Sequence, residues 1–194
     1  MNASRFDFVL RRGVAAQHAH RYTEAEACFR EALAIAPNDP EVISLLGLSL
    51  THGDGLEEGT QLLERAVQLD PRQPGLRFNL VDGLVAGQDY GRALGVLHTV
   101  LDSDPGNLQA WLRAGDIAQL QGDVAGAVEA WNRAHDAHPA AAAPRNGLAI
   151  LRRLDAAATD WFANDASSGR MTPPLGIDTP SSSLSEMRIA EREE

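Results

Sequence analysis

Residues 40–73, PEVISLLGLSLTHGDGLEEGTQLLERAVQLDPRQ, and residues 74–107, PGLRFNLVDGLVAGQDYGRALGVLHTVLDSDPGN, are two successive copies of one 34-residue pattern. The pattern continues on both sides of this stretch. Prolines recur every 34 residues without drift, at Pro37, Pro71, Pro105 and Pro139. A fixed period of this size indicates a repeat solenoid, in which each unit stacks on the next.

Small and large residues also keep fixed phases of the period. Glycine recurs at Gly13, Gly47 and Gly115. A large apolar residue recurs at Phe29, Leu63, Leu97 and Trp131. The glycines mark places where two helices approach closely, because a larger side chain there would force them apart. Each proline ends the second helix of a unit because it cannot continue the helical hydrogen-bond ladder.

Taken phase by phase, the pattern resembles the tetratricopeptide repeat family, whose unit is a pair of antiparallel helices. Leu46 and Gly47 match the family's most typical pair of positions, whereas Arg77 stands where the family has a large apolar residue. The resemblance implies an all-α fold, a right-handed superhelical solenoid of such pairs. After a lead-in at residues 1–5, four repeats are predicted at 6–39, 40–73, 74–107 and 108–141.

The pattern changes after the fourth repeat. Residues 142–163 are predicted to form a capping helix that covers the exposed face of the last repeat. Residues 164–194 are predicted to be a flexible acidic tail, because much of this segment has too few aliphatic residues to offset the entropy of ordering. Within the tail, residues 183–192 are either solubilising or a docking peptide that becomes a short helix on contact.

Composition narrows the class of partner. The net charge is −10, and all 17 basic residues are arginine. We therefore expect no nucleic-acid partner, because such proteins usually present a basic face. No stretch approaches the roughly 20 apolar residues of a membrane span, so we expect no membrane partner either. The lone Cys28 excludes an internal disulfide. A cytoplasmic, bacterial protein is expected, since no targeting signal is visible and the arginine usage is typical of a GC-rich genome.

The resemblance also implies a partner-binding groove on the first helices of the repeats. The residues at the family's groove positions are Leu10, Arg11, Val14, Leu45, Leu48, His52, Phe78, Asn79, Asp82, Leu112, Arg113 and Asp116. Apolar anchors between polar groups suit a peptide or an amphipathic helix. Chaperone adaptors of this family clamp a terminal carboxylate, but here only Asn79 and Arg113 match that clamp. These two residues remain candidates for holding some other acidic group.

No catalytic constellation is evident in the sequence. It contains no glycine-rich phosphate loop and no nucleophile elbow. His18 and His52 share a repeat phase, but no third ligand joins them in a metal site. We therefore predict a non-enzymatic adaptor or scaffold without a cofactor. Two alternatives remain open: a substrate-recruiting or chaperone-like subunit that acts in trans with a separate enzyme, and a self-assembling module that forms a homo-oligomer.

Overall fold

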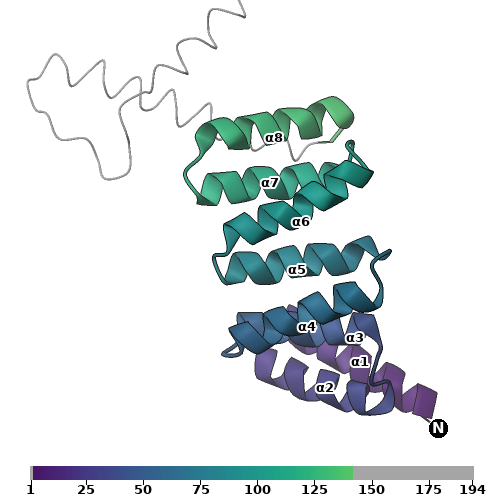
Figure 1. Ribbon diagram of the computed structural model, residues 1–194. Helices are drawn as coiled ribbons and strands as arrows, with labels where there is room; N and C mark the ends of the chain where they lie inside the picture. Colours follow the sequence, from purple (N-terminus) through teal and green to yellow (C-terminus); the bar gives the residue numbers. More distant parts are fainter. Residues whose placement is uncertain (1, 142–194) are drawn as a thin grey trace, which may run out of the picture. The chain divides into compact units, whose positions relative to one another are not determined.

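The computed structural model describes residues 2–141, which form eight α-helices and, within that range, no strand (Figure 1). The helices in chain order are α1 (Asn2–His18), α2 (Tyr22–Ile35), α3 (Pro40–His52), α4 (Leu56–Leu69), α5 (Pro74–Ala86), α6 (Tyr90–Ser103), α7 (Leu108–Leu120) and α8 (Val124–Ala137). The chain divides into two units, and all eight helices belong to the first, Met1–Asn146. The predicted capping helix at 142–163, the tail at 164–194 and its short helix at 183–192 lie outside the described residues.

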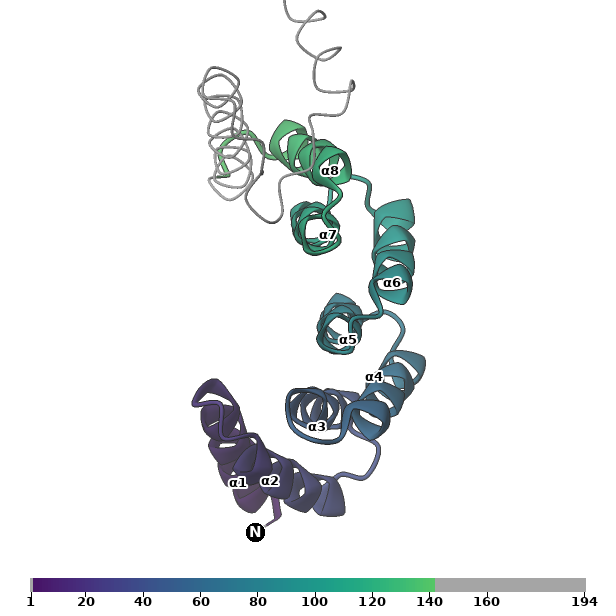
Figure 2. The same ribbon diagram turned by 90° about the vertical axis from the view of Figure 1, so that its left-hand side faces the viewer.

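Within the first unit, consecutive helices pack as hairpins in two layers. Each odd-numbered helix packs against the even-numbered helix that follows it, and α3 also packs against α5. In Figure 2, α3, α5 and α7 lie on one side of the stack and α4 and α6 on the other, while α8 lies beyond α7 at the end. We call α3, α5 and α7 the inner helices and α4, α6 and α8 the outer helices, with α1 and α2 as the corresponding first pair. The predicted all-α helical-repeat solenoid is confirmed.

The prolines end the outer helices as predicted. The last residues of α2, α4, α6 and α8 are Ile35, Leu69, Ser103 and Ala137, each two residues before a proline. Proline has no N–H and restricts the residue before it, so the helix cannot extend through it. At the other end, Asp39 caps α3 by accepting hydrogen bonds from the N–H groups of Glu41 and Val42. Such caps satisfy amide groups that have no partner inside the helix.

The recurrent glycines and the recurrent large apolar residues of the sequence meet inside three of the hairpins. A Cβ atom added to Gly13 would lie 2.6 Å from Cε1 of Phe29, and one added to Gly47 would lie 2.8 Å from Cγ of Leu63. The rings and chains that fill this space are fully buried, with Phe29 and Leu63 both 0% exposed. Burying one such side chain contributes roughly 1.5–3 kcal/mol. The predicted close approach of the two helices at these glycines is therefore confirmed. Cys28 also lies in this core, 2% exposed, as a free thiol.

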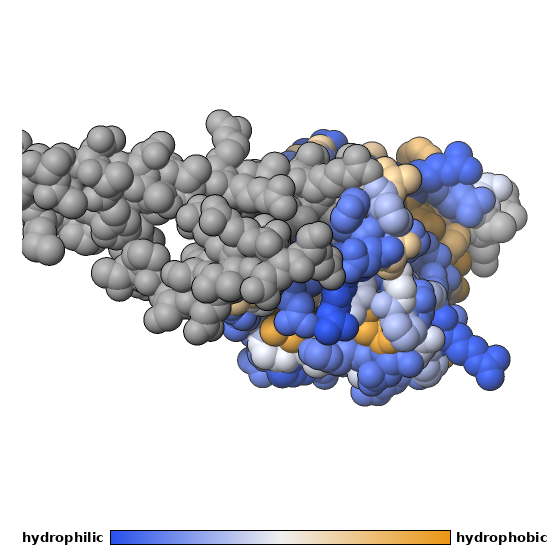
Figure 3. Space-filling model, turned by 90° about the horizontal axis from the view of Figure 1, so that it is seen from above, coloured by the Kyte–Doolittle hydropathy of each residue, from blue (hydrophilic) through white to orange (hydrophobic). Residues whose placement is uncertain are grey.

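On the face drawn in Figure 3, the described residues expose only scattered apolar groups. Viewed from the α8 end, the described surface is mainly hydrophilic, with hydrophobic side chains in small separate areas (Figure 3). Phe8 is the most exposed large apolar side chain among the described residues, at 65%, followed by Leu120 at 60%. Single exposed apolar residues are normal on protein surfaces. Within residues 2–141, no helix has the length and hydrophobicity needed to cross a bilayer.

Candidate peptide-binding surface on the inner helices

The predicted groove residues all lie on the four inner helices, three from each. Their spacing of one, three or four residues brings the members from one helix to a common side. Arg11, His52 and Asp116 are exposed, and Phe78 is buried at 6% exposure. The remaining eight are half-buried: Leu10, Val14, Leu45, Leu48, Asn79, Asp82, Leu112 and Arg113. The helices therefore offer partly accessible aliphatic groups beside polar ones.

Five of the six apolar groove residues, all but Leu112, divide between two packed clusters. Leu10, Val14 and Leu45 pack at the edge of the core formed by the first three helices. Leu48 packs instead with the cluster that contains Phe78, on α5. The structure thus brings α3 residues into contact with both neighbours. It does not place the α1 residues and the α5 residues in one cluster.

Arg113 is the centre of a polar group on α5 and α7. Its Nη1 atom pairs with Oδ1 of Asp82, and its guanidinium lies over the ring of Phe78, 5.4 Å from the ring centroid. Burial lowers the pKa of Arg113, and the negative charge of Asp116 opposes that shift. When ionised, the one guanidinium and the two carboxylates of Arg113, Asp82 and Asp116 together carry one net negative charge.

The carboxyl group of Asp116 is partly desolvated, although the residue as a whole is exposed. Partial burial raises the pKa of its carboxyl group, while a hydrogen bond from Trp131 and the charge of Arg113 act in the opposite direction. Desolvation favours the neutral form of a carboxyl group, whereas a nearby positive charge favours the ionised form. Asp116 is therefore a carboxylate that gains from a cationic partner.

Asn79 uses its amide donor inside the protein. Its Nδ2 atom donates a hydrogen bond to Oγ of Ser44, at 2.9 Å, and Ser44 is fully buried. This bond links α5 to α3. Among the described residues no partner donates to the amide oxygen of Asn79, which remains an acceptor. The two candidates for holding an acidic group, Asn79 and Arg113, are thus already engaged by Ser44 and Asp82.

His52 lies apart from the Arg113 group. Its ring stacks on Tyr22 of α2, with centroids 5.4 Å apart and planes inclined by 23°. The Tyr22 hydroxyl in turn shares a hydrogen bond of 2.8 Å with Nδ1 of His20. His52 is therefore held at the α1–α2 turn by Tyr22 rather than by His18. In residues 2–141 no cluster of three or more His, Cys, Asp or Glu side chains is arranged to hold a metal ion.

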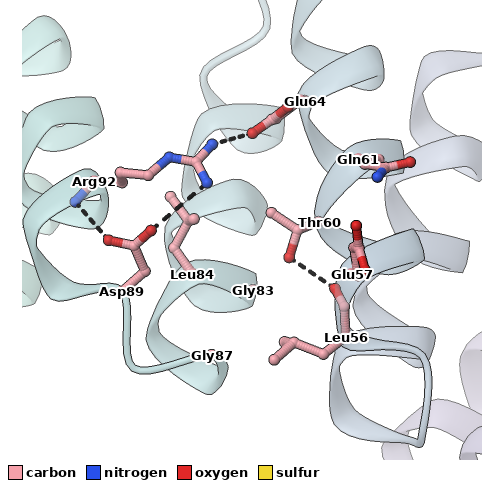
Figure 4. A pocket seen from close by; sticks show the side chains of 10 residues that line it. All are labelled: Leu56, Glu57, Thr60, Gln61, Glu64, Gly83, Leu84, Gly87, Asp89 and Arg92. Atoms are coloured by element: carbon pink, nitrogen blue, oxygen red, sulfur yellow. Dashed lines mark hydrogen bonds and ion pairs between the residues drawn. The ribbon is translucent and has the colours of Figure 1, made fainter.

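Sequence reasoning missed a second surface, on the outer side. A groove runs between α4 and α6 with α5 as its floor, and we call it the outer groove. One pocket in it, of about 510 Å³, lies near the first turn of α4 (Figure 4). A second, of about 400 Å³, lies farther along α4 and α6. Both pockets share Glu64, Leu84 and Arg92. The one signal in the sequence was Arg77, where the family has an apolar residue and where the second pocket opens.

Comparison with known proteins agrees with this architecture. Family models described as tetratricopeptide repeat match residues 7–39 and 78–143, together about half of the chain. The chain is 33% identical over 93 residues to the peroxisomal targeting signal receptor of Saccharomyces cerevisiae. That match covers 48% of this chain and 15% of the receptor, so the chain spans a small part of this relative.

Two solved structures show the same fold. YrrB, a TPR protein with an unusual peptide-binding site, is 24% identical with a TM-score of 0.57, and the match covers 69% of each chain. A mutant O-GlcNAc transferase of Thermobaculum terrenum is 25% identical with a TM-score of 0.57, over 69% of this chain and 27% of the transferase. The repeat period, the paired helices and these matches agree. The chain belongs to the tetratricopeptide repeat family.

Proposed function

We propose that this protein is a non-enzymatic adaptor or scaffold, which binds a peptide or an amphipathic helix of another protein on its inner helices. The tetratricopeptide repeat is a protein–protein interaction module. The observation that carries the proposal is the polar group around Arg113 on α5 and α7, together with the half-buried aliphatic residues of α3 and α7. Aliphatic anchors supply apolar area to a bound peptide, and polar groups between them fix its register.

The partner chemistry that fits the group around Arg113 is cationic rather than acidic. Asp82 and Asp116 outnumber Arg113, and the free amide atom of Asn79 is an acceptor. A partner segment with an arginine or lysine beside an aliphatic residue would supply the missing donor and positive charge. The net charge of −10 supports the same conclusion, because long-range attraction raises the association rate of basic partners.

Affinity capture from the native host tests the proposal with two matched variants. Asp116→Arg reverses a charge on the inner surface, and Asp102→Arg makes the same change at an exposed position of α6 on the outer side. Both variants must retain helical circular dichroism. We expect partners captured by the wild type to be kept by Asp102→Arg and lost with Asp116→Arg. Partners that Asp116→Arg retains in full would contradict the inner surface as the binding site.

A second candidate is a recruiting subunit that acts in trans with a separate enzyme. The match to the O-GlcNAc transferase favours it, because there a repeat region of this fold belongs to an enzyme chain. One stoichiometric enzyme in the captured material would support this function. Many clients at low stoichiometry would support a chaperone-like role instead. Self-assembly is tested separately by the solution mass at high concentration, where a strictly monomeric chain would exclude a homo-oligomer.

A further inference from the structure

The outer groove is crossed by one ion-pair network. Arg92 of α6 pairs with Glu64 of α4, and its Nη1 atom also lies 3.6 Å from Oδ2 of Asp89, at the start of α6 (Figure 4). The positive charge of Arg92 is therefore balanced within the protein. The network separates the two pockets, which differ in charge. Glu57 and Asp89 line the first pocket, whereas Arg77 lines the second.

The second pocket has apolar walls and open space. Its aliphatic lining residues are Val67, Leu80, Leu84 and Val96. Gly95 also lines it, and a Cβ atom added there would meet no atom within 4 Å. Glycine inside a helix costs about 1 kcal/mol relative to alanine. No neighbour among residues 2–141 requires that glycine, so its effect in this structure is to leave the pocket wide.

Arg77 is the unusual residue of this pocket. The corresponding residues of the first two repeats, Val9 and Ile43, are 3% and 1% exposed and fill the space between neighbouring helices. Arg77 is half-buried, and its side chain forms neither a hydrogen bond nor an ion pair with any described residue. Its guanidinium is therefore available to an anion, with which it would form charge-assisted hydrogen bonds.

We propose that this pocket binds a segment of a partner protein in which a carboxylate stands next to an aliphatic side chain. The carboxylate pairs with the guanidinium of Arg77, whose planar fork matches its two oxygens. The aliphatic group enters between Val67, Leu80 and Val96. Glu57 and Asp89 repel an acidic group from the first pocket, so the carboxylate is directed to the Arg77 end. This site is separate from the group around Arg113 on the inner helices, where acceptors predominate.

The test uses two small probes on the full chain, followed by ¹⁵N-resolved NMR. N-acetyl-leucine carries a carboxylate beside an isobutyl group, and N-acetyl-leucinamide has the same shape without the charge. We expect N-acetyl-leucine to shift the amide signals of Arg77, Gly95 and Val96, with saturation on the order of 1–10 mM for so small a ligand. The amide should bind at least about ten-fold more weakly, because it lacks the charge that pairs with Arg77.

Three variants locate the binding. Arg77→Gln should remove the preference for the carboxylate, and Gly95→Leu should block the pocket while leaving Arg77 in place. Arg72→Gln makes the same change at an exposed arginine of the α4–α5 turn and should bind like the wild type. Equal shifts with both probes in the wild type would overturn the proposal, as would undiminished binding to a folded Arg77→Gln. If signals of residues 183–194 shift together with Gly95, the occupant is this chain's own tail and not a partner.

Discussion

The indole of Trp131 lies against the α-carbon of Gly115, in the space that a side chain at position 115 would occupy. Gly13 has the same relationship to Phe29, and Gly47 has it to Leu63. The recurrent glycine and the recurrent large apolar residue of the sequence therefore contact each other, and this contact is repeated in three hairpins. In the remaining hairpin Val81 replaces the glycine and is itself buried, at 1% exposure.

Substitutions at two helical glycines should therefore have opposite effects. Gly115→Ala places a methyl group against Trp131, and we expect it to lower the free energy of unfolding by about 1–3 kcal/mol. Gly91→Ala, in α6, meets no atom within 4 Å and should raise it by about 0.5–1 kcal/mol through helix propensity. Urea unfolding followed by circular dichroism measures both. Equal effects of the two variants would mean that the contact with Trp131 does not limit residue size.

Three of the four turns inside the hairpins have a left-handed backbone at one repeat phase. His20 has φ of 56° there, Gln88 has 59° and Gly122 has 76°. A left-handed conformation costs a non-glycine residue roughly 1–2 kcal/mol. We expect Gln88→Gly to raise the melting temperature and Gly122→Ala to lower it. Asp54 occupies the same phase without a positive φ, so Asp54→Gly should give no gain. A comparable gain at position 54 would contradict this explanation.

Helix capping differs between repeats at one phase. Asp39 accepts two backbone hydrogen bonds at the start of α3, whereas Gln73 accepts none at the start of α5. Asp39→Ala should lower the free energy of unfolding by about 0.5–2 kcal/mol. Gln73→Asp should raise it by part of that amount, because it adds a cap at the start of α5. Thermal unfolding of the two single variants and the double variant checks this. The effects should add, because the two caps share no partner.

The raised pKa of Asp116 predicts a pH-dependent effect of removing its charge. Ionisation of this carboxyl group costs stability in the folded protein, since its pKa there lies above the ordinary value of 3.8. Asp116→Asn should therefore raise the free energy of unfolding near pH 7. The gain should fall as the pH drops through the folded pKa, and it should vanish where Asp116 is protonated in both states.

Asparagine keeps an acceptor for the Trp131 indole, so the comparison isolates the charge. Asp116→Ala is the control, because it leaves that indole without its acceptor and should destabilise the protein at both ends of the pH range. Unfolding curves at pH 7 and pH 3 measure the differences. A gain for Asp116→Asn that persists unchanged at pH 3 would contradict the raised pKa.

The sequence by itself determined the repeat length, the ends of the outer helices and the glycines that permit close packing. These features are local or periodic, because proline stops any helix and a 34-residue period repeats one hairpin. The resemblance to the repeat family also predicted which residues lie on the inner helices. The position of each of these residues on its helix follows from its place in the 34-residue period. This place can be read from one repeat without knowing how the repeats pack.

Only the tertiary structure decided how those residues are used. Arg113 pairs with Asp82, 31 positions away, and Asn79 bonds to Ser44, 35 positions away, so both groups are engaged by side chains of other repeats. Arg77 was visible in the sequence as a departure from the family pattern. That it lines a pocket beside Gly95 depends on how α4, α5 and α6 meet. Charge pairing and pocket shape arise between repeats, where packing sets the distances and the sequence period does not.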